Sequence, residues 1–238
     1  MLKNGIVYLI VSLFCTHGVF ATKPYASPAS TDYSSSGGSS GYAASPQSVN
    51  TLQGEGGSSA TPASTDYINE NEVYTIGQLA QGGVIFYLDS TKKHGLVCSL
   101  KNISTSLTWA PSYDNCGANQ DGIGAGAYNT QQIIATGGGS YTSSNCAAVA
   151  CDALRDGGYS DWYLPSLDEL NQLYLQKTTV NSACTRAGGD MLLGAVYWSS
   201  LEGSEDPADF AWVEAFSNGY QDYDYKDDVP AVRAVRAF

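Results

Sequence analysis

The architecture of this chain is decided by a short stretch in its C-terminal third, Asp161-Trp162-Tyr163-Leu164-Pro165-Ser166-Leu167-Asp168-Glu169-Leu170. Ser166 and Glu169 have the spacing of a capping box, in which the serine hydroxyl and the glutamate carboxylate each accept from the other's backbone amide. An apolar stripe then follows at helical spacing, formed by Leu167, Leu170, Leu173 and Tyr174. The stretch therefore predicts a helix that begins after Ser166 and buries one side.

Short strands and two further helices are predicted around this helix. Apolar runs at 84–88 and 96–98, joined by a polar turn, indicate a hairpin. Similar runs predict strands at 196–198, 211–216 and 232–235, the last two flanking a Tyr- and Asp-rich segment. Two segments that end at glycine predict helices at 131–135 and 146–155. We therefore expect an α+β domain over residues 74–238, with short antiparallel strands and two or three helices.

The N-terminal third has the composition of an export signal followed by a linker. Residues 1–21 place Lys3 before an apolar run and end in a small-residue cleavage site, which is typical of a signal peptide. A lipidated Cys15 is the alternative. Residues 22–73 are rich in Ser, Gly, Pro, Ala and Thr and contain two near copies, at 27–33 and 61–67, so a disordered linker is predicted. We expect an exported protein at the cell surface or outside the cell, without a transmembrane span.

The charge balance argues against nucleic acid as a partner. The chain has 23 acidic and 11 basic residues, a formal net charge of -12. Such a chain repels polyanions in general.

Several blocks, in order, resemble the bacterial family of the Legionella collagen-like adhesin C-terminal domain. They are the stretch at 161–170, Tyr197-Trp198-Ser199-Ser200, the segment 211–219, the end at 232–238 and an opening hairpin at 82–97. The resemblance implies a C-type-lectin-like fold and an adhesin, whose best-known relative binds sulfated polysaccharides. This chain lacks the collagen Gly-x-y period, and it offers few cations for sulfate: Lys226, Arg233 and Arg236.

Five cysteines follow the predicted signal peptide, so in an oxidising compartment at least one stays unpaired within the chain. Cys98 lies in an apolar strand and is expected to be buried. Cys146 and Cys151 would point to nearly opposite sides of their helix, and we expect them to pair with Cys116 and Cys184. The sequence leaves the connectivity open.

Catalytic and metal-binding motifs are sparse. His94 lies in a turn beside two lysines, without the partners that a triad or a zinc site needs. Carboxylates are plentiful, which keeps a secreted carbohydrate-active enzyme with paired carboxylates as an alternative. No cofactor is expected, although a calcium site is a hypothesis for four clustered carboxylates: Glu202, Glu205, Asp206 and Asp209.

The candidate binding surface is a segment in which tyrosine and aspartate alternate. Its predicted ligand-binding residues are Tyr220, Asp222, Tyr223, Asp224, Tyr225, Asp227 and Asp228. On an extended chain we expect the tyrosines on one face and the aspartates on the other, giving a rigid amphipathic contact area. An ordinary edge hairpin is the alternative. The predominance of Tyr and Asp also fits a receptor diversified by a retroelement that mutates adenines, because asparagine codons mutated in this way yield mainly Tyr, Asp, Ser and His.

These features together predict a surface-displayed adhesin or ligand-binding module. Its partner would be a glycan or a protein on a host or neighbouring cell. A purely structural envelope protein is a further alternative, and a homo-oligomer is compatible with the sequence.

Overall fold

The computed structural model describes residues 73–238. The predicted signal peptide (1–21) and all but the last residue of the predicted linker (22–73) lie outside the described residues. Within residues 73–238, no helix has the length and apolar character needed to cross a bilayer. The account below therefore concerns the C-terminal domain.

The first sheet joins the two ends of the domain. It has four antiparallel strands in the order β1 (Leu79–Ala80), β2 (Gly83–Leu88), β3 (Gly95–Cys98) and β7 (Val235–Ala237). Strand β7, the last of the chain, pairs with β3 near the start of the domain. The fold is therefore closed by contacts between residues about 140 positions apart, which no local signal specifies.

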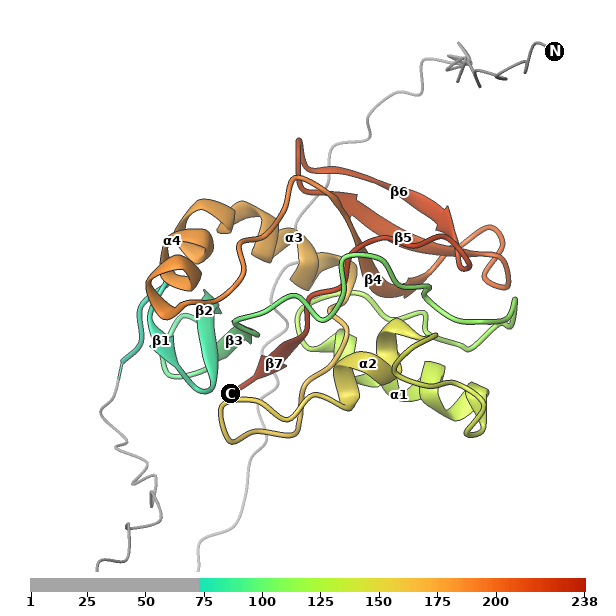
Figure 1. Cartoon of the computed structure of the whole chain (residues 1–238), viewed down its shortest axis with the longest axis horizontal. Helices are drawn as coiled ribbons and strands as arrows, with labels where there is room; N and C mark the ends of the chain where they lie inside the picture. The colour runs from blue at the N-terminus through green and yellow to red at the C-terminus, as the bar shows by residue number, and fades with distance from the viewer. Residues whose placement is uncertain (1–72) are drawn as a thin grey trace, which may run out of the picture. The chain divides into compact units, whose positions relative to one another are not determined.

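The second sheet carries the candidate site. It has three antiparallel strands in the order β4 (Val196–Glu202), β5 (Phe210–Ala215) and β6 (Tyr220–Tyr225). Strand β6 lies at one edge, with hydrogen bonds only to β5 among the strands described. Figure 1 shows α3 beside this sheet, with α1 and α2 next to its other end.

Four helices complete the domain: α1 (Ala125–Gly137), α2 (Ala147–Asp152), α3 (Leu167–Leu175) and α4 (Lys177–Ala187). The capping box of α3 is confirmed, because the amide of Glu169 donates to Ser166 Oγ at 3.2 Å and the amide of Ser166 donates to Glu169 Oε2 at 2.9 Å. Helix α1 begins earlier than predicted, at Ala125 instead of residue 131. Helix α4 was not predicted, so the expected two or three helices become four.

The domain has two hydrophobic cores, and strand β4 contributes side chains to both. One contains the three buried tryptophans Trp109, Trp162 and Trp198. The other gathers Tyr197 and Phe216, whose ring centroids are 4.5 Å apart, with apolar residues of α3 and α4. Adjacent residues of β4 thus serve different cores, as the alternation of a strand requires.

The α+β class with short antiparallel strands is confirmed by this architecture, whereas the C-type-lectin-like assignment remains a prediction. Two expectations about single residues are also confirmed: Cys98 is buried in β3, and His94 is exposed in its turn. The final strand is displaced from the predicted 232–235 to Val235–Ala237.

Candidate functional site

Strand β6 pairs with β5 over all six of its residues. Side chains alternate between the faces of a sheet. Tyr223 and Tyr225 therefore share one face, and Tyr220 lies on the other face with Asp222 and Asp224. The expectation that all three tyrosines share a face was wrong for Tyr220, which is three residues from Tyr223 and so has the opposite orientation.

Four aromatic side chains share one face of β5 and β6, which we call the aromatic face: the half-buried Phe210 and Trp212 and the exposed Tyr223 and Tyr225. In the register, Phe210 lies opposite Tyr225 and Trp212 opposite Tyr223. The ring centroids of these pairs are 4.6 Å and 4.4 Å apart, and Phe210 is 6.3 Å from Tyr223. Tyr225 remains 51% exposed and Tyr223 36% exposed. Two aromatic pairs thus lie side by side, each with one exposed tyrosine and one half-buried ring.

A polar pair continues the same face. Glu214 lies opposite Gln221, next to Trp212 and Tyr223, and the Gln221 amide donates to Glu214 Oε2 at 3.5 Å. Glu214 is buried, and its Oε1 has no hydrogen-bond partner. Burial raises the pKa of Glu214 to about 7, against a smaller lowering by the Gln221 amide. Helix α3 packs against β5 and β4, and the aromatic face is the part of this surface that remains exposed.

A pocket of about 240 Å³ opens beside the aromatic face. Its lining combines two rings, two carboxylates and a glycine: Phe210, Tyr223, Glu205, Asp206 and Gly203. A side chain at Gly203 would crowd Phe210, because a Cβ there would lie 2.9 Å from Phe210 Cβ. The residues that line the pocket are therefore mainly aromatic and acidic.

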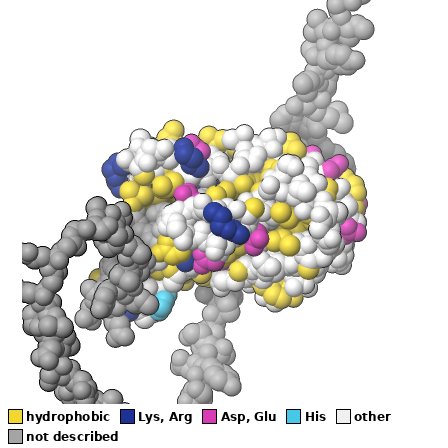
Figure 2. Space-filling view, turned by 60° about the horizontal axis from the view of Figure 1, so that its bottom comes forward, with side chains coloured by type: hydrophobic (Ala, Val, Ile, Leu, Met, Phe, Trp, Pro, Cys, Tyr) yellow, Lys and Arg dark blue, Asp and Glu magenta, His cyan; other side chains and the backbone are white. Residues whose placement is uncertain are grey.

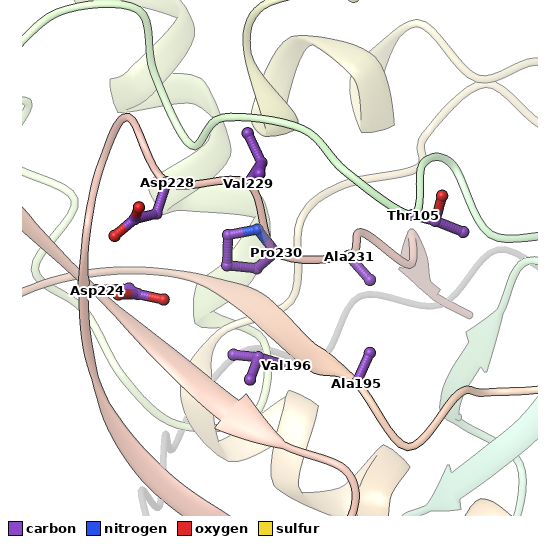
Figure 3. Close-up of a pocket in the computed structure, with 8 residues that line it drawn as sticks. All are labelled: Thr105, Ala195, Val196, Asp224, Asp228, Val229, Pro230 and Ala231. Atoms are coloured by element: carbon purple, nitrogen blue, oxygen red, sulfur yellow. The ribbon is translucent and has the colours of Figure 1, made fainter. Parts of the chain in front are cut away.

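The opposite face of β6 carries an acidic groove of about 360 Å³ (Figure 3), lined by Thr105, Ala195, Val196, Asp224, Asp228, Val229, Pro230 and Ala231. Burial, then a hydrogen bond that protonated Asp224 donates to Asp228, raises the pKa of Asp224 to about 6. The negative charge of Asp222 also raises the pKa of Asp224. Asp227 instead faces Tyr113 and, through a hydrogen bond, raises the pKa of that phenol to about 12.

The tyrosines and aspartates predicted to bind ligand are thus divided between two surfaces. Tyr223 and Tyr225 belong to the aromatic face, and Tyr220, Asp222, Asp224 and Asp228 lie at or near the acidic groove. Phe210, Trp212, Gly203 and Gln221 were missed as site residues. The available signal is the alternation of a strand, which places Trp212 and Val213 on opposite faces. Val213 is buried, and Trp212 lies on the aromatic face.

The four residues considered as calcium ligands make different contacts in the structure. Glu202 is buried, and its Oε1 accepts from Lys226 Nζ at 2.6 Å. The amides of Cys116 and Ala118 also donate to Glu202, at 2.8 Å and 3.0 Å. Glu205 and Asp206 line the aromatic pocket instead, and the Asp209 carbonyl accepts from the amide of Lys226. Across residues 73–238, no group of three or more His, Cys, Asp or Glu side chains is placed to hold a metal ion.

Lys226 is a structural cation and not a free one. Its Nζ also donates to the carbonyls of Asp114 and Pro207, each at 2.7 Å, and lies 4.4 Å from the centre of the Trp109 ring. Arg236 is paired with Asp161, and Arg233 is buried among carbonyls. The three cations considered for sulfate binding are therefore committed to the fold.

The predicted disulfides are not present. Cys98, Cys116, Cys146, Cys151 and Cys184 are all buried free thiols. Cys184 lies in the second core, where Arg233 donates to its Sγ at 3.2 Å, while Cys146 and Cys151 lie in the first core with Cys116. The pairing of Cys184 with a cysteine of α2 or its cap fails because the two belong to different cores.

The family model for the Lcl C-terminal domain matches residues 100–236, more than half of the chain. The chain belongs to the Lcl C-terminal domain family. Membership indicates an adhesin-like surface or exported protein that meets external partners. The matched range includes the whole second sheet and both surfaces of β6. A search of curated proteins gave no match.

Proposed function

We propose that this Lcl-type domain is a recognition module that binds a glycan through the aromatic face. The observation that carries the proposal is the open ladder of two aromatic pairs, Phe210–Tyr225 and Trp212–Tyr223. A sugar ring has a flat face of C–H groups that matches an aromatic ring in size. Tyrosine and tryptophan add a polar edge for the hydroxyl groups around it.

The spacing of the ladder supports binding of more than one sugar unit. Residues two apart on a strand lie about 7 Å from each other on the same face. The two aromatic pairs therefore offer consecutive stacking surfaces, and Gln221 supplies an amide next to them. The rings also hold one another in place, so little side-chain entropy is lost when a ligand binds.

An adhesin-like role on the cell surface is consistent with the family and with the predicted export signal. Figure 2 shows one face of the domain on which the few lysine and arginine side chains stand apart from one another, several of them beside aspartate or glutamate. Contact by apolar rings and hydrogen bonds fits such a surface better than attraction of a polyanion does.

The test is a glycan-binding screen of the purified chain beside single variants. Trp212→Ala and Tyr223→Ala each remove one ring of the same pair, and we expect about tenfold weaker binding or more. Tyr220→Ala is the matched control, because Tyr220 lies on the same strand but is 62% exposed on the other face. Circular dichroism checks that each variant folds.

Loss of binding in both ring variants, with the control unchanged, would support the proposal. Equal losses in all three variants, or losses only in Tyr220→Ala, would move the site away from the aromatic face. Absence of binding to every glycan would remove the glycan proposal.

A further inference from the structure

We infer that the bound glycan carries an ammonium group, as an unacetylated amino sugar does, and that this group enters the pocket beside Phe210 and Tyr223. The inference rests on the proposed function and names the ligand's chemistry within it. It also departs from the sulfated ligand that the family resemblance suggested.

The walls of the pocket suit a cation. Phe210 and Tyr223 both line the pocket, with their rings inclined at 53° and their centroids 6.3 Å apart. The face of an aromatic ring attracts an ammonium group through its quadrupole. Glu205 and Asp206 also line the pocket, and carboxylates of this kind are acceptors for the N–H groups of an ammonium ion. Gly203 lies in close contact with Phe210, because a Cβ at this position would be only 2.9 Å from Phe210 Cβ.

The charges around the pocket also distinguish a cation from an anion. None of its lining residues is lysine or arginine. Lys226, which follows the aromatic face directly in sequence, is buried against Glu202 and fully hydrogen-bonded. A sulfate group placed here would meet two carboxylates and no compensating cation, and like charges at this range repel. The same field attracts an amine.

The position of the pocket connects it to the stacking surface. Phe210 and Tyr223 contribute to both the pocket and the aromatic face. A sugar stacked on the Trp212–Tyr223 pair would therefore have a substituent within reach of Glu205 and Asp206. A 2-amino group on a sugar unit is such a substituent.

The experiment compares three probes on the whole chain: oligomers of glucosamine, oligomers of N-acetylglucosamine of the same length, and a sulfated polysaccharide. Isothermal titration at about pH 6 keeps both the sugar amine and ordinary carboxyl groups charged. We expect the amine oligomer to bind about tenfold tighter than the acetylated one, with a preference that shrinks as salt rises. At about pH 9 the amine is neutral and the preference should vanish.

The double variant Glu205→Gln with Asp206→Asn should reduce the preference to about twofold or less, while binding of the acetylated oligomer stays unchanged. Asp222→Asn with Asp228→Asn is the matched control, because it removes the same formal charge from the opposite face of β6. That control should retain the preference.

Equal affinity for the two oligomers, a preference for the sulfated polymer, or a preference that survives the Glu205/Asp206 variant would overturn the inference and leave the aromatic face standing. No binding of any glycan to the unmodified chain would overturn the proposed function and the inference together.

Discussion

At the scale of single residues, the ion pair between Lys226 and Glu202 is the most buried electrostatic contact described. Both side chains are almost fully inaccessible, and the Nζ–Oε1 distance is 2.6 Å. Lys226 also anchors the carbonyls of Asp114 and Pro207, so one ammonium group holds together three segments distant in sequence. Its position directly after β6 fixes where that strand ends.

We expect Lys226→Met to lower the free energy of unfolding by about 3–5 kcal/mol, because it leaves the Glu202 carboxylate buried without a cation. Urea denaturation measures the change. Lys101→Met is the control, since Lys101 and Asp190 form an exposed pair at 3.6 Å whose loss should cost less than about 1 kcal/mol. Similar losses in both variants would argue against the structural importance of the buried pair.

Glu214 gives the domain a pH-dependent stability. Burial raises the pKa of Glu214 from 4.5 to about 7 in the folded state. The folded state therefore keeps a proton that the unfolded state releases, so stability falls as pH rises from about 4.5 to about 7 and stays reduced above that.

Glu214→Gln removes this titration while keeping the size of the side chain. Relative to the unmodified chain, we expect a gain of about 1 kcal/mol at about pH 8 and none at about pH 4, after allowance for solvent screening. Urea curves recorded across this range test it. A difference between the two proteins that does not change with pH would contradict the assignment.

At the scale of elements, the start of helix α3 organises the region between the two cores. Besides its capping partner, Glu169 accepts from the amide of Gly124 at 2.8 Å and from the Tyr163 hydroxyl at 3.0 Å. Ser166 Oγ donates to the carbonyl of Gly122 at 2.8 Å. The cap of α3 therefore also fixes the loop from which α1 begins.

We expect Ser166→Ala to cost about 1–2 kcal/mol of stability, since it removes the N-cap acceptor. Ser182→Ala is a suitable comparison, because the Ser182 hydroxyl only donates to the Thr178 carbonyl within α4 and is exposed. Thermal unfolding should show a clear fall in the midpoint for the first variant and almost none for the second. An equal, small effect would mean that the capping box contributes little here.

At the scale of the whole molecule, five buried thiols lie within a tightly closed domain. Cys98 has a pKa raised to about 11 by burial, and burial also raises the pKa of Cys151. The thiolate is the reactive form, so native thiols of this kind should be inert.

A thiol-specific reagent should therefore label none of these five cysteines rapidly in the native chain and all five after unfolding in denaturant without a reducing agent. Peptide mapping by mass spectrometry identifies the sites. Cysteines that become labelled only after reduction would show that the protein contains disulfides, as the sequence predicted. The labelled sites would then identify which cysteines are paired.

Local signals in the sequence predicted the elements whose cause is local. The capping box at Ser166, the hairpin around 89–95 and the strand at 211–216 each depend on residues within a few positions of one another. Helix α4 escaped prediction because it has no side-chain cap and contains three β-branched residues, Thr178, Thr179 and Val180, near its start. Burial of Val180, Ala183 and Cys184 in the second core outweighs that weak propensity.

The sequence by itself determined an α+β domain, its Lcl-type character and an alternating, tyrosine-rich strand near the end of the chain. Only the tertiary structure decided which tyrosines work together, because the register between β5 and β6 sets Tyr223 beside Trp212 and Tyr225 beside Phe210. It also decided that Lys226 is buried with Glu202, 24 residues away, and that Glu205 and Asp206 line a pocket together with Phe210 and Tyr223. Such contacts arise from strand pairing and core packing between distant segments, so they cannot be predicted from the periodicity of any one segment.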